Sequence, residues 1–416
     1  MEKISIVHYA APPIVGGVES TIFHHSRLLV EAGFSVDVIA GRGEEFEHKV
    51  GFHEIPSIDS RHPEVLSIGE ELSQGIVSQN FYDLRDLLIR SLKTVLLNSD
   101  LCIVHNVITL HKNLPLTAAI HAISEEELLP IISWSHDFAW SDDLYTSDLH
   151  DGYPWDLLRM PWRGVRHVVV STHRRALLAQ LLNISEGEIK VITPGVDTCQ
   201  FFRCHPLTQE IFDANDLAEA DPLILVPARL TRRKNIQFAL RVTAALRENK
   251  QKVRLIITGP PGPHNPSNME YLEELQALKN ELGMEGHVIF FYELGKAGVP
   301  LHAPDEVLTD LYMLCDLLLF PSFREGFGIP VLEAGLTRLP VFASDIPPIR
   351  ESGGEFTELI NPDGDPADVA KRISEFLCVD NAYQLKKRVV AKYTWQSIIT
   401  KKLIPFAMEA IADERR

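Results

Sequence analysis

The stretch that decides the fold is Leu317-Leu318-Leu319-Phe320-Pro321-Ser322-Phe323-Arg324-Glu325-Gly326-Phe327-Gly328-Ile329-Pro330-Val331-Leu332-Glu333-Ala334. Its apolar start, Leu317–Phe320, predicts a short buried strand. Pro330 suits the first turn of a following helix, because the N–H that proline lacks has no partner there. Gly326 and Gly328 let the backbone approach a ligand closely, and free N–H groups at a helix start attract oxygen-rich groups. The stretch therefore predicts a strand, a turn and a helix that bind a polar ligand.

Two glutamates, Glu325 and Glu333, stand eight residues apart in this stretch. On one continuous helix they would lie about 12 Å apart along the axis, which is far too wide for paired acid and base catalysis at one bond. The spacing suits contacts with two separate polar groups of one elongated ligand, such as a sugar and a ribose. The alternative is a capped helix with two solvated glutamates.

A basic loop follows the apolar strand at 223–227 and precedes an expected helix from Ile236. It contains four cations within six residues, namely Arg229, Arg232, Arg233 and Lys234. An arginine fork matches phosphate oxygens and a lysine supplies a mobile positive charge, which together suit a diphosphate. The alternative is a solvated basic loop.

Two weaker signals lie in the first half of the chain. Gly16 and Gly17 stand between an expected strand and an expected helix, where an anion can bind, although a structural role is equally supported. His136 directly follows the expected strand 131–135 and could bond a sugar hydroxyl or move a proton. Aromatic and acidic residues between 140 and 162 suit a carbohydrate acceptor, or else an irregular solvated loop.

Strand-like and helix-like segments alternate along the first half, and the pattern restarts near residue 223. Such alternation predicts α/β architecture with parallel sheets covered on both faces, hence two doubly wound, Rossmann-like domains. We expect domains at 1–197 and 198–394, a helical tail at 395–416 and an insertion at 295–307. Strands are expected at 4–8, 35–40, 101–105, 131–135, 168–171, 189–192, 223–227, 253–258, 288–291, 317–320 and 341–343.

Composition excludes several classes of protein. The 416 residues carry a net charge of −17, which disfavours a nucleic-acid partner because an acidic surface repels phosphates. No apolar run reaches the roughly 20 residues that an integral membrane segment needs. The first residues enter a strand directly, without the layout of a signal peptide. Five cysteines without zinc spacing indicate a reducing compartment, so we expect a cytoplasmic protein, with homo-oligomerisation left open.

No phosphate-binding loop of the Gly-x-x-x-x-Gly-Lys type and no dinucleotide fingerprint is found. Asp363-Gly364-Asp365 could suggest a metal site, but its neighbouring prolines and asparagine favour a turn and a helix cap. We therefore expect no metal site and no cofactor other than a co-substrate.

Together these motifs resemble the retaining glycosyltransferases of family 4, also described as glycosyl transferases group 1. The resemblance depends on the Glu-x7-Glu pair, Glu325 and Glu333, and on the Arg-x4-Lys pair, Arg229 and Lys234; it is strongest over 223–365. It implies the GT-B fold, in which an acceptor-binding domain and a nucleotide-sugar-binding domain face each other across a cleft. It also implies that the C-terminal helix crosses back to the N-terminal domain.

The resemblance implies metal-independent transfer of a hexosyl group, with retention, from a UDP-glucose-type or GDP-mannose-type donor to a small hydroxylated acceptor. A disaccharide phosphorylase, a nucleotide-sugar epimerase or a non-catalytic nucleotide-sugar-binding protein stays open as an alternative. The resemblance also implies a role for each site residue. Arg229 and Lys234 would bind the diphosphate, and Glu333 would bind the ribose. Glu325 and the backbone of Gly326, Phe327 and Gly328 would bind the donor sugar, His136 would contact the sugar, and Gly16 and Gly17 would approach the phosphate or the acceptor.

Overall fold

The structure is a computed structural model that describes residues 2–262, 267–296 and 299–414. The chain divides into two compact units, of which the first comprises residues 1–196 and 393–416 and the second residues 197–392. Met1, residues 297–298 of the expected insertion and residues 415–416 of the expected tail lie outside the described residues.

The first unit is built on a parallel sheet, in which the described residues form seven strands in the order β3-β2-β1-β4-β5-β6-β7. The order reverses direction between β1 and β4, which makes the carboxyl ends of these two strands the topological switch point. The strands are β1 (Lys3–His8), β2 (Ser35–Ala40), β3 (Val50–Glu54), β4 (Leu101–His105), β5 (Ile131–Ser135), β6 (Val165–Val169) and β7 (Ile189–Val191).

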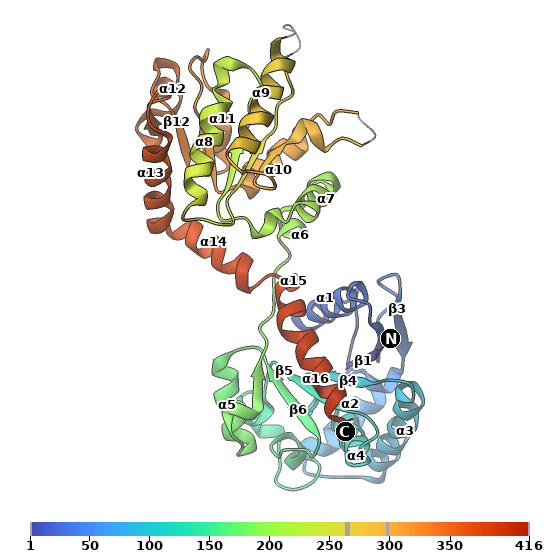
Figure 1. Cartoon of the computed structure of the whole chain (residues 1–416). Helices are drawn as coiled ribbons and strands as arrows, with labels where there is room; N and C mark the ends of the chain where they lie inside the picture. The colour runs from blue at the N-terminus through green and yellow to red at the C-terminus, as the bar shows by residue number, and fades with distance from the viewer. Residues whose placement is uncertain (1, 263–266, 297–298, 415–416) are drawn as a thin grey trace. The chain divides into compact units, whose positions relative to one another are not determined.

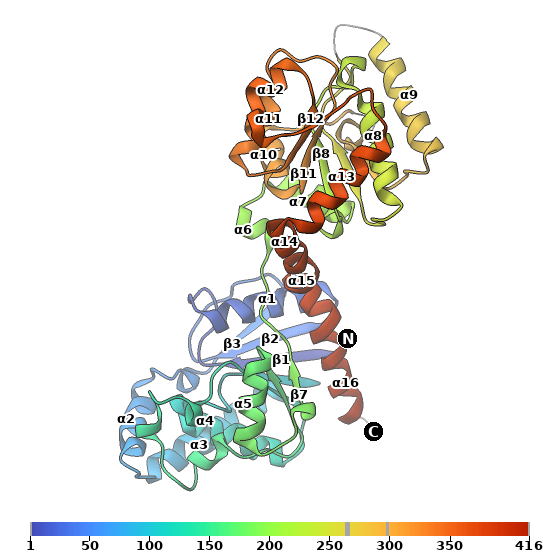
Figure 2. The ribbon, with the colours of Figure 1, turned by 90° about the vertical axis from the view of Figure 1, so that its left-hand side faces the viewer.

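Helices cover both faces of this sheet (Figures 1 and 2). One face packs against α2, α3 and α4, and the other packs against α1 and the C-terminal segment. The helices are α1 (Gly17–Glu31), α2 (Pro63–Ser73), α3 (Gln79–Leu96), α4 (Leu114–Glu125), α5 (Thr172–Leu182), α15 (Trp395–Ile398) and α16 (Ile404–Glu414), with a π-helical turn at Ile399–Leu403.

The second unit repeats this plan with a smaller parallel sheet, for which the described residues supply six strands in the order β10-β9-β8-β11-β12-β13. Its switch point lies between β8 and β11. The strands are β8 (Leu223–Val226), β9 (Arg254–Ile257), β10 (Val288–Phe290), β11 (Leu317–Phe320), β12 (Val341–Ser344) and β13 (Glu358–Ile360).

Figure 2 shows α10, α11 and α12 on one side of the second sheet and α8, α9 and α13 on the other. The α/β expectation of two doubly wound, Rossmann-like units is therefore confirmed. The helices are α6 (Thr198–Phe202), α7 (Pro206–Ala214), α8 (Ile236–Arg247), α9 (Ser267–Glu281), α10 (Asp305–Leu314), α11 (Ile329–Leu336), α12 (Pro347–Gly353), α13 (Pro366–Val379) and α14 (Asn381–Lys392).

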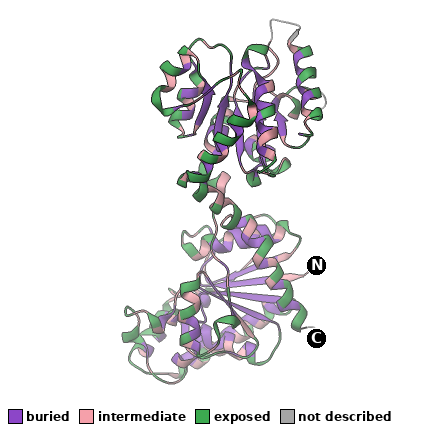
Figure 3. Ribbon diagram, turned by 60° about the vertical axis from the view of Figure 1, so that its left-hand side comes forward, coloured by how far each residue is buried: buried purple, intermediate pink, exposed green. Residues whose placement is uncertain are grey.

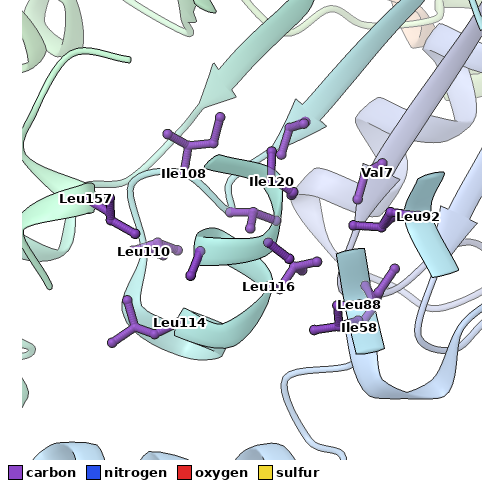
Figure 4. Packing of buried hydrophobic residues seen from close by; sticks show 14 of the residues in the cluster. Val7, Ile58, Leu88, Leu92, Ile108, Leu110, Leu114, Leu116, Ile120 and Leu157 are labelled. Atoms are coloured by element: carbon purple, nitrogen blue, oxygen red, sulfur yellow. The ribbon is translucent and has the colours of Figure 1, made fainter. Parts of the chain in front are cut away.

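Apolar periodicity explains how the helices dock. In α3 the residues Leu84, Leu88 and Leu92 recur every four positions and are at most 1% exposed, so they form one stripe that faces the sheet. Figure 4 shows Leu88 and Leu92 beside Val7 of β1. Figure 3 shows the strands of both sheets as buried, which is the pattern of parallel sheets covered on two faces.

The C-terminal segment packs on the first unit, as the expected crossing helix requires. The Trp395 ring stacks on the His24 ring with centroids 4.9 Å apart, and Arg166 of β6 forms ion pairs with Glu409 and Asp413 of α16. Ile398, Leu403 and further apolar residues of the segment belong to the same buried cluster as β1.

Some sequence predictions were wrong in detail. The strand expected at 168–171 is β6, Val165–Val169, and β3 and β13 were not predicted. The segment 295–307 was expected to be an insertion outside the core, but Val307 is fully buried and Leu301 packs against a core cluster. Asp365 caps α13 by accepting a hydrogen bond from the Ala367 N–H at 2.9 Å, which confirms the structural interpretation of Asp363-Gly364-Asp365.

A buried carboxylate anchors β11, the strand that leads into the glycine-rich turn. The Asp316 side chain is 0% exposed and forms ion pairs with Lys386 (2.8 Å) and Lys387 (2.5 Å) of α14. Its Oδ2 also accepts a hydrogen bond from the Leu223 N–H at 2.7 Å, at the start of β8. Asp316 therefore joins the two strands of the switch point to a helix.

We predict that Asp316→Ala lowers the free energy of unfolding by about 3–5 kcal/mol, because two lysines lose a buried partner. The control is Glu219→Ala, which removes an ion pair with Lys252 whose side chains are 58% and 62% exposed, and which should cost at most about 1 kcal/mol. Urea denaturation followed by circular dichroism measures both values. Equal losses in the two variants would contradict the anchoring role of Asp316.

Candidate functional site

The two strongest motifs of the sequence meet at the switch point of the second unit. The basic loop follows β8 and the glycine-rich turn follows β11, and these strands are neighbours in the sheet. The Phe323 N–H donates a hydrogen bond to the Arg233 carbonyl at 2.9 Å, and Arg233 Nη1 donates to the Arg324 carbonyl at 3.3 Å. The fold therefore joins two loops that lie about ninety residues apart in sequence into one site.

A buried ion pair forms the centre of this site. Lys234 Nζ donates to Glu325 Oε1 at 2.5 Å, and the two side chains are only 11% and 9% exposed. The ammonium group also lies 4.8 Å from the centre of the Phe320 ring, a cation–π distance. Burial lowers the pKa of Lys234, and the neighbouring Glu325 opposes that effect.

Only some of the four cations of the basic loop face this centre. Arg232 forms an ion pair with Glu274 of α9 at 2.5 Å and lies over the Tyr271 ring. Arg229 is exposed, and its side chain has no ion-pair partner within residues 2–262, 267–296 and 299–414. Arg233 Nη1 lies 3.6 Å from Glu325 Oε2, so two cations of the loop, Arg233 and Lys234, pair with Glu325. Arg232 instead forms a surface ion pair, and Arg229 is the exposed cation of the loop.

A close backbone approach holds the Arg229 loop in place. A Cβ atom on Gly259, which follows β9, would lie 2.2 Å from the Ala228 carbonyl oxygen. The Leu230 N–H donates to the Pro260 carbonyl at 3.0 Å. Position 259 therefore requires glycine, because any side chain would push the Arg229 loop away.

The two glutamates of the Glu-x7-Glu pair do not lie on one helix. Glu325 precedes the helix, which begins at Ile329 after Gly328 in a left-handed conformation with φ of 98°. Gly326 and Phe327 are exposed at this turn, and they leave the amino end of α11 accessible. The helix places Glu333, which is partly exposed, about one turn after its start.

Tyr312 of α10 contacts Glu333 and was missed by the sequence analysis. Its hydroxyl donates a hydrogen bond to Glu333 Oε2 at 2.6 Å, and the tyrosine is 4% exposed. The signal available in the sequence was a tyrosine within an otherwise apolar stretch just before the strand that carries the motif.

The first unit holds the other predicted residues at its own switch point. His8 ends β1, and its Nδ1 lies 2.8 Å from the carbonyl of His105, which ends β4. Gly16 and Gly17 form the amino end of α1. A Cβ atom on Gly16 would lie 2.1 Å from the Glu19 Oε2 atom, so a carboxylate of the chain itself lies over this helix end, where a negative charge is favoured.

Asn106, which follows β4, holds the turn that contains His136. Its Oδ1 accepts hydrogen bonds from the N–H groups of His136 and Asp137, at 3.0 and 3.1 Å. Asn106 has a left-handed backbone with φ of 56°, which asparagine tolerates better than most residues. Sequence reasoning missed Asn106, because its partners lie 30 residues later in the chain.

Buried aromatic rings connect His136 to the interior of the first unit. The ring centres of His136 and His105 are 6.2 Å apart, those of His105 and His25 are 5.4 Å apart, and those of His25 and Trp134 are 4.5 Å apart. Burial lowers the pKa of His136 and lowers that of His25 to about 3. His136 is therefore neutral near pH 7 and suited to hydrogen bonding rather than to charge stabilisation.

The described residues contain neither a metal-binding cluster nor a membrane-spanning helix. No group of three or more His, Cys, Asp or Glu side chains in residues 2–262, 267–296 and 299–414 is arranged to hold a metal ion. Among the helices of those ranges, none is both long enough and apolar enough to cross a bilayer.

Comparison with known families matches both halves of the chain. Residues 208–390 match the family described as Glycosyl transferases group 1, and residues 15–200 match the family described as Glycosyltransferase Family 4. The first range includes the site at β8 and β11, and the second includes Gly16, Gly17 and His136.

Individual relatives are distant. Mannosylglucosylglycerate synthase of Petrotoga mobilis is 25% identical over 275 residues, covering 61% of each chain. An uncharacterized glycosyltransferase of Methanocaldococcus jannaschii is 25% identical over 419 residues, covering 95% of each chain. D-inositol 3-phosphate glycosyltransferase of Corynebacterium jeikeium is 30% identical over 219 residues, covering 50% of this chain and 49% of that one. The chain thus spans less than two thirds of the first and third of these relatives.

We predict that the buried histidines make the first unit acid-sensitive. The pKa of His25 is about 3 when folded and about 6.5 when unfolded. The unfolded chain therefore binds the proton more tightly, and stability falls as pH decreases from about 6.5 toward 3. By pH 4.5 this residue alone should cost about 2–3 kcal/mol relative to pH 7.5.

The variant His25→Phe should lose less stability than the native chain between pH 7.5 and 4.5, as measured by urea denaturation at each pH. The control is His48→Phe, at an exposed loop position, whose free energy of unfolding should change with pH as that of the native chain does. If that of His25→Phe also changes as in the native chain, the buried ring does not contribute to the acid sensitivity.

Proposed function

Because the chain belongs to the group 1 glycosyltransferases, we propose that it transfers a hexosyl group from a nucleoside-diphosphate sugar to a hydroxyl acceptor with retention of configuration. The single observation that carries this proposal is the Lys234–Glu325 ion pair at the switch point of the second unit. The loop that contains Lys234 also carries the exposed Arg229, and Glu325 lies in the turn that leads into the amino end of α11. Ligands of doubly wound sheets bind at this position.

The charges of the site suit the departure of a nucleoside diphosphate. When the bond between sugar and phosphate breaks, negative charge increases on the diphosphate. Arg229, Lys234 and the N–H groups at the start of α11 would stabilise that charge more strongly in the transition state than in the ground state. These groups supply the neutralisation within the chain itself, so the proposal includes no metal ion and no protein nucleophile.

Glu325 has two successive partners in this proposal. Without donor, its carboxylate pairs with the buried ammonium of Lys234, which would otherwise be a costly unpaired charge. When the donor binds, a phosphate oxygen replaces Glu325 as the partner of Lys234. The Glu325 carboxylate can then accept hydrogen bonds from hydroxyls of the donor sugar. Gly326, Phe327 and Gly328 would contribute backbone N–H groups, and Glu333 would accept the ribose hydroxyls.

The first unit is proposed to bind the acceptor. A neutral His136, held by Asn106, would accept or donate a hydrogen bond with a sugar hydroxyl, and the start of α1 at Gly16 and Gly17 would approach a phosphate or the acceptor. The names of two relatives, mannosylglucosylglycerate synthase and D-inositol 3-phosphate glycosyltransferase, refer to small polar compounds. We therefore propose a small hydroxylated acceptor, with a UDP-glucose-type or GDP-mannose-type donor.

A panel of UDP, GDP and ADP with their sugars tests the donor class. We predict that one nucleoside diphosphate raises the melting temperature, because a ligand that binds only the folded state stabilises it. Lys234→Ala should reduce kcat/KM for transfer roughly 100-fold or more, as loss of one transition-state charge contact does. The control Lys252→Ala removes an exposed lysine that pairs with Glu219 and should retain native turnover.

Two outcomes would contradict the proposed function. If no nucleoside diphosphate shifts the melting temperature, the second unit does not bind this class of donor. If Lys234→Ala turns over like the native protein, the diphosphate is not held at this ion pair.

The double role of Glu325 predicts opposite effects on binding and on turnover. Glu325→Gln removes the carboxylate that competes with the diphosphate for Lys234. The affinity for the bare nucleoside diphosphate should therefore rise roughly three- to tenfold, the effect of about 1 kcal/mol, while transfer should fall roughly 100-fold or more. Isothermal titration calorimetry and a transfer assay measure the two quantities. A variant that binds the nucleoside diphosphate more weakly than the native chain would contradict the exchange of partners.

A further inference from the structure

We propose that Tyr312 is a positioning residue that orients the Glu333 carboxylate toward the ribose and so makes the site prefer ribonucleotides to 2′-deoxyribonucleotides. The inference rests on the proposed function, because it deepens the ribose-binding role of Glu333. Neither the family matches nor the sequence motifs point to Tyr312, which comes before the strand rather than after it.

The contact between the two side chains is short and isolated. The Tyr312 hydroxyl donates to Glu333 Oε2 at 2.6 Å, a distance typical of a hydrogen bond to an ionised oxygen. Within the described ranges the Glu333 carboxylate has no other side-chain hydrogen bond and no ion pair. Tyr312 is therefore the one described group that sets the direction of this carboxylate.

Packing makes Tyr312 a rigid donor. It is 4% exposed and belongs to the buried cluster that joins α10 to α11 and includes Leu311, Val331 and Ala334. A ring enclosed in this way cannot change rotamer without opening the core. Burial, followed by the nearby Glu333 carboxylate, raises the pKa of Tyr312, so the hydroxyl stays protonated and keeps donating over any working pH range.

A fixed carboxylate suits a vicinal diol. The 2′- and 3′-hydroxyls of a ribose can donate two hydrogen bonds to one carboxylate, and Glu333 Oε1 has no partner among the described residues. Holding the carboxylate in advance lowers the rotamer entropy that ligand binding must remove. Once the tyrosine hydroxyl is lost, the partly exposed side chain is free to rotate and this advantage disappears.

A purely structural role makes a different prediction. If Tyr312 only holds α10 against α11, its loss should weaken the binding of every nucleotide to the same extent. If it orients Glu333, its loss should weaken the binding of ribonucleotides more than that of 2′-deoxyribonucleotides, because a deoxyribose keeps only one of the two hydroxyls that Glu333 accepts. The ratio of the two affinities therefore separates the two roles.

The experiment uses the full chain and the nucleoside diphosphate that stabilises it best, together with the 2′-deoxy form of that nucleotide. Calorimetry on the native protein should give tighter binding of the ribonucleotide, roughly fivefold or more, for one additional hydrogen bond. In Tyr312→Phe this ratio should fall toward one, while the affinity for the deoxynucleotide stays within about twofold. In turnover the KM for the donor should rise with kcat nearly unchanged, because ribose binding is the same in ground and transition states.

Tyr383→Phe is the matched control. Tyr383 of α14 is 5% exposed, and its hydroxyl donates to the carboxylate of Asp221, so the substitution removes the same kind of hydrogen bond in the same unit. Both variants are expected to lower the melting temperature, but only Tyr312→Phe should change the affinity ratio.

Three results would overturn the inference, and each has a separate meaning. If Tyr312→Phe keeps the native ratio of ribonucleotide to deoxynucleotide affinity, for example because it binds both nucleotides equally more weakly, Tyr312 has a purely structural role. A native protein that binds both nucleotides equally shows that Glu333 does not recognise the ribose. A native protein that binds no nucleoside diphosphate overturns the proposed function itself.

Discussion

The ion pair between Lys234 and Glu325 is the interaction on which the site of the second unit depends. The strand order places β8 beside β11, so the loops that follow these strands meet. The Lys234–Glu325 ion pair joins the two loops, and both of its side chains are about nine-tenths buried. A lysine in that position requires an anionic partner. Glu325 is that partner in the structure, and we propose that a diphosphate replaces it, because a diphosphate brings more negative charge to Lys234 and to the exposed Arg229.

The two units use the same strand order for different chemistry. In the second unit the switch point carries cations, an ion pair and an accessible helix start. In the first unit it carries the rings of His8 and His136, whose pKa burial lowers, beside the ion pair of Arg174 with Asp137. We propose that the first arrangement binds a diphosphate, whereas the neutral histidine rings of the second offer hydrogen bonds to sugar hydroxyls. This difference between the two switch points supports the proposed assignment of donor and acceptor to different units.

Local patterns predicted the fold well, and long-range contacts account for what was missed. The strand at Leu317–Phe320 and the helix with Pro330 in its first turn follow from adjacent residues, and the structure confirms both. β3 was not predicted because it is a half-exposed edge strand that contains Gly51, so its sequence lacks the continuous apolar pattern of a buried strand. The contacts of Tyr312 with Glu333 and of Asn106 with His136 span 21 and 30 residues, so local patterns do not show which residues these side chains contact. The pairing of Arg232 with Glu274 likewise depends on how α9 packs.

The most direct test of the central claim is a crystal structure of the protein with its preferred nucleoside diphosphate. The account predicts diphosphate oxygens within hydrogen-bonding distance of Arg229 and Lys234, the ribose hydroxyls on Glu333, and Glu325 separated from Lys234. A nucleotide bound away from the β8–β11 switch point, or bound there while Lys234 stays paired with Glu325, would contradict it.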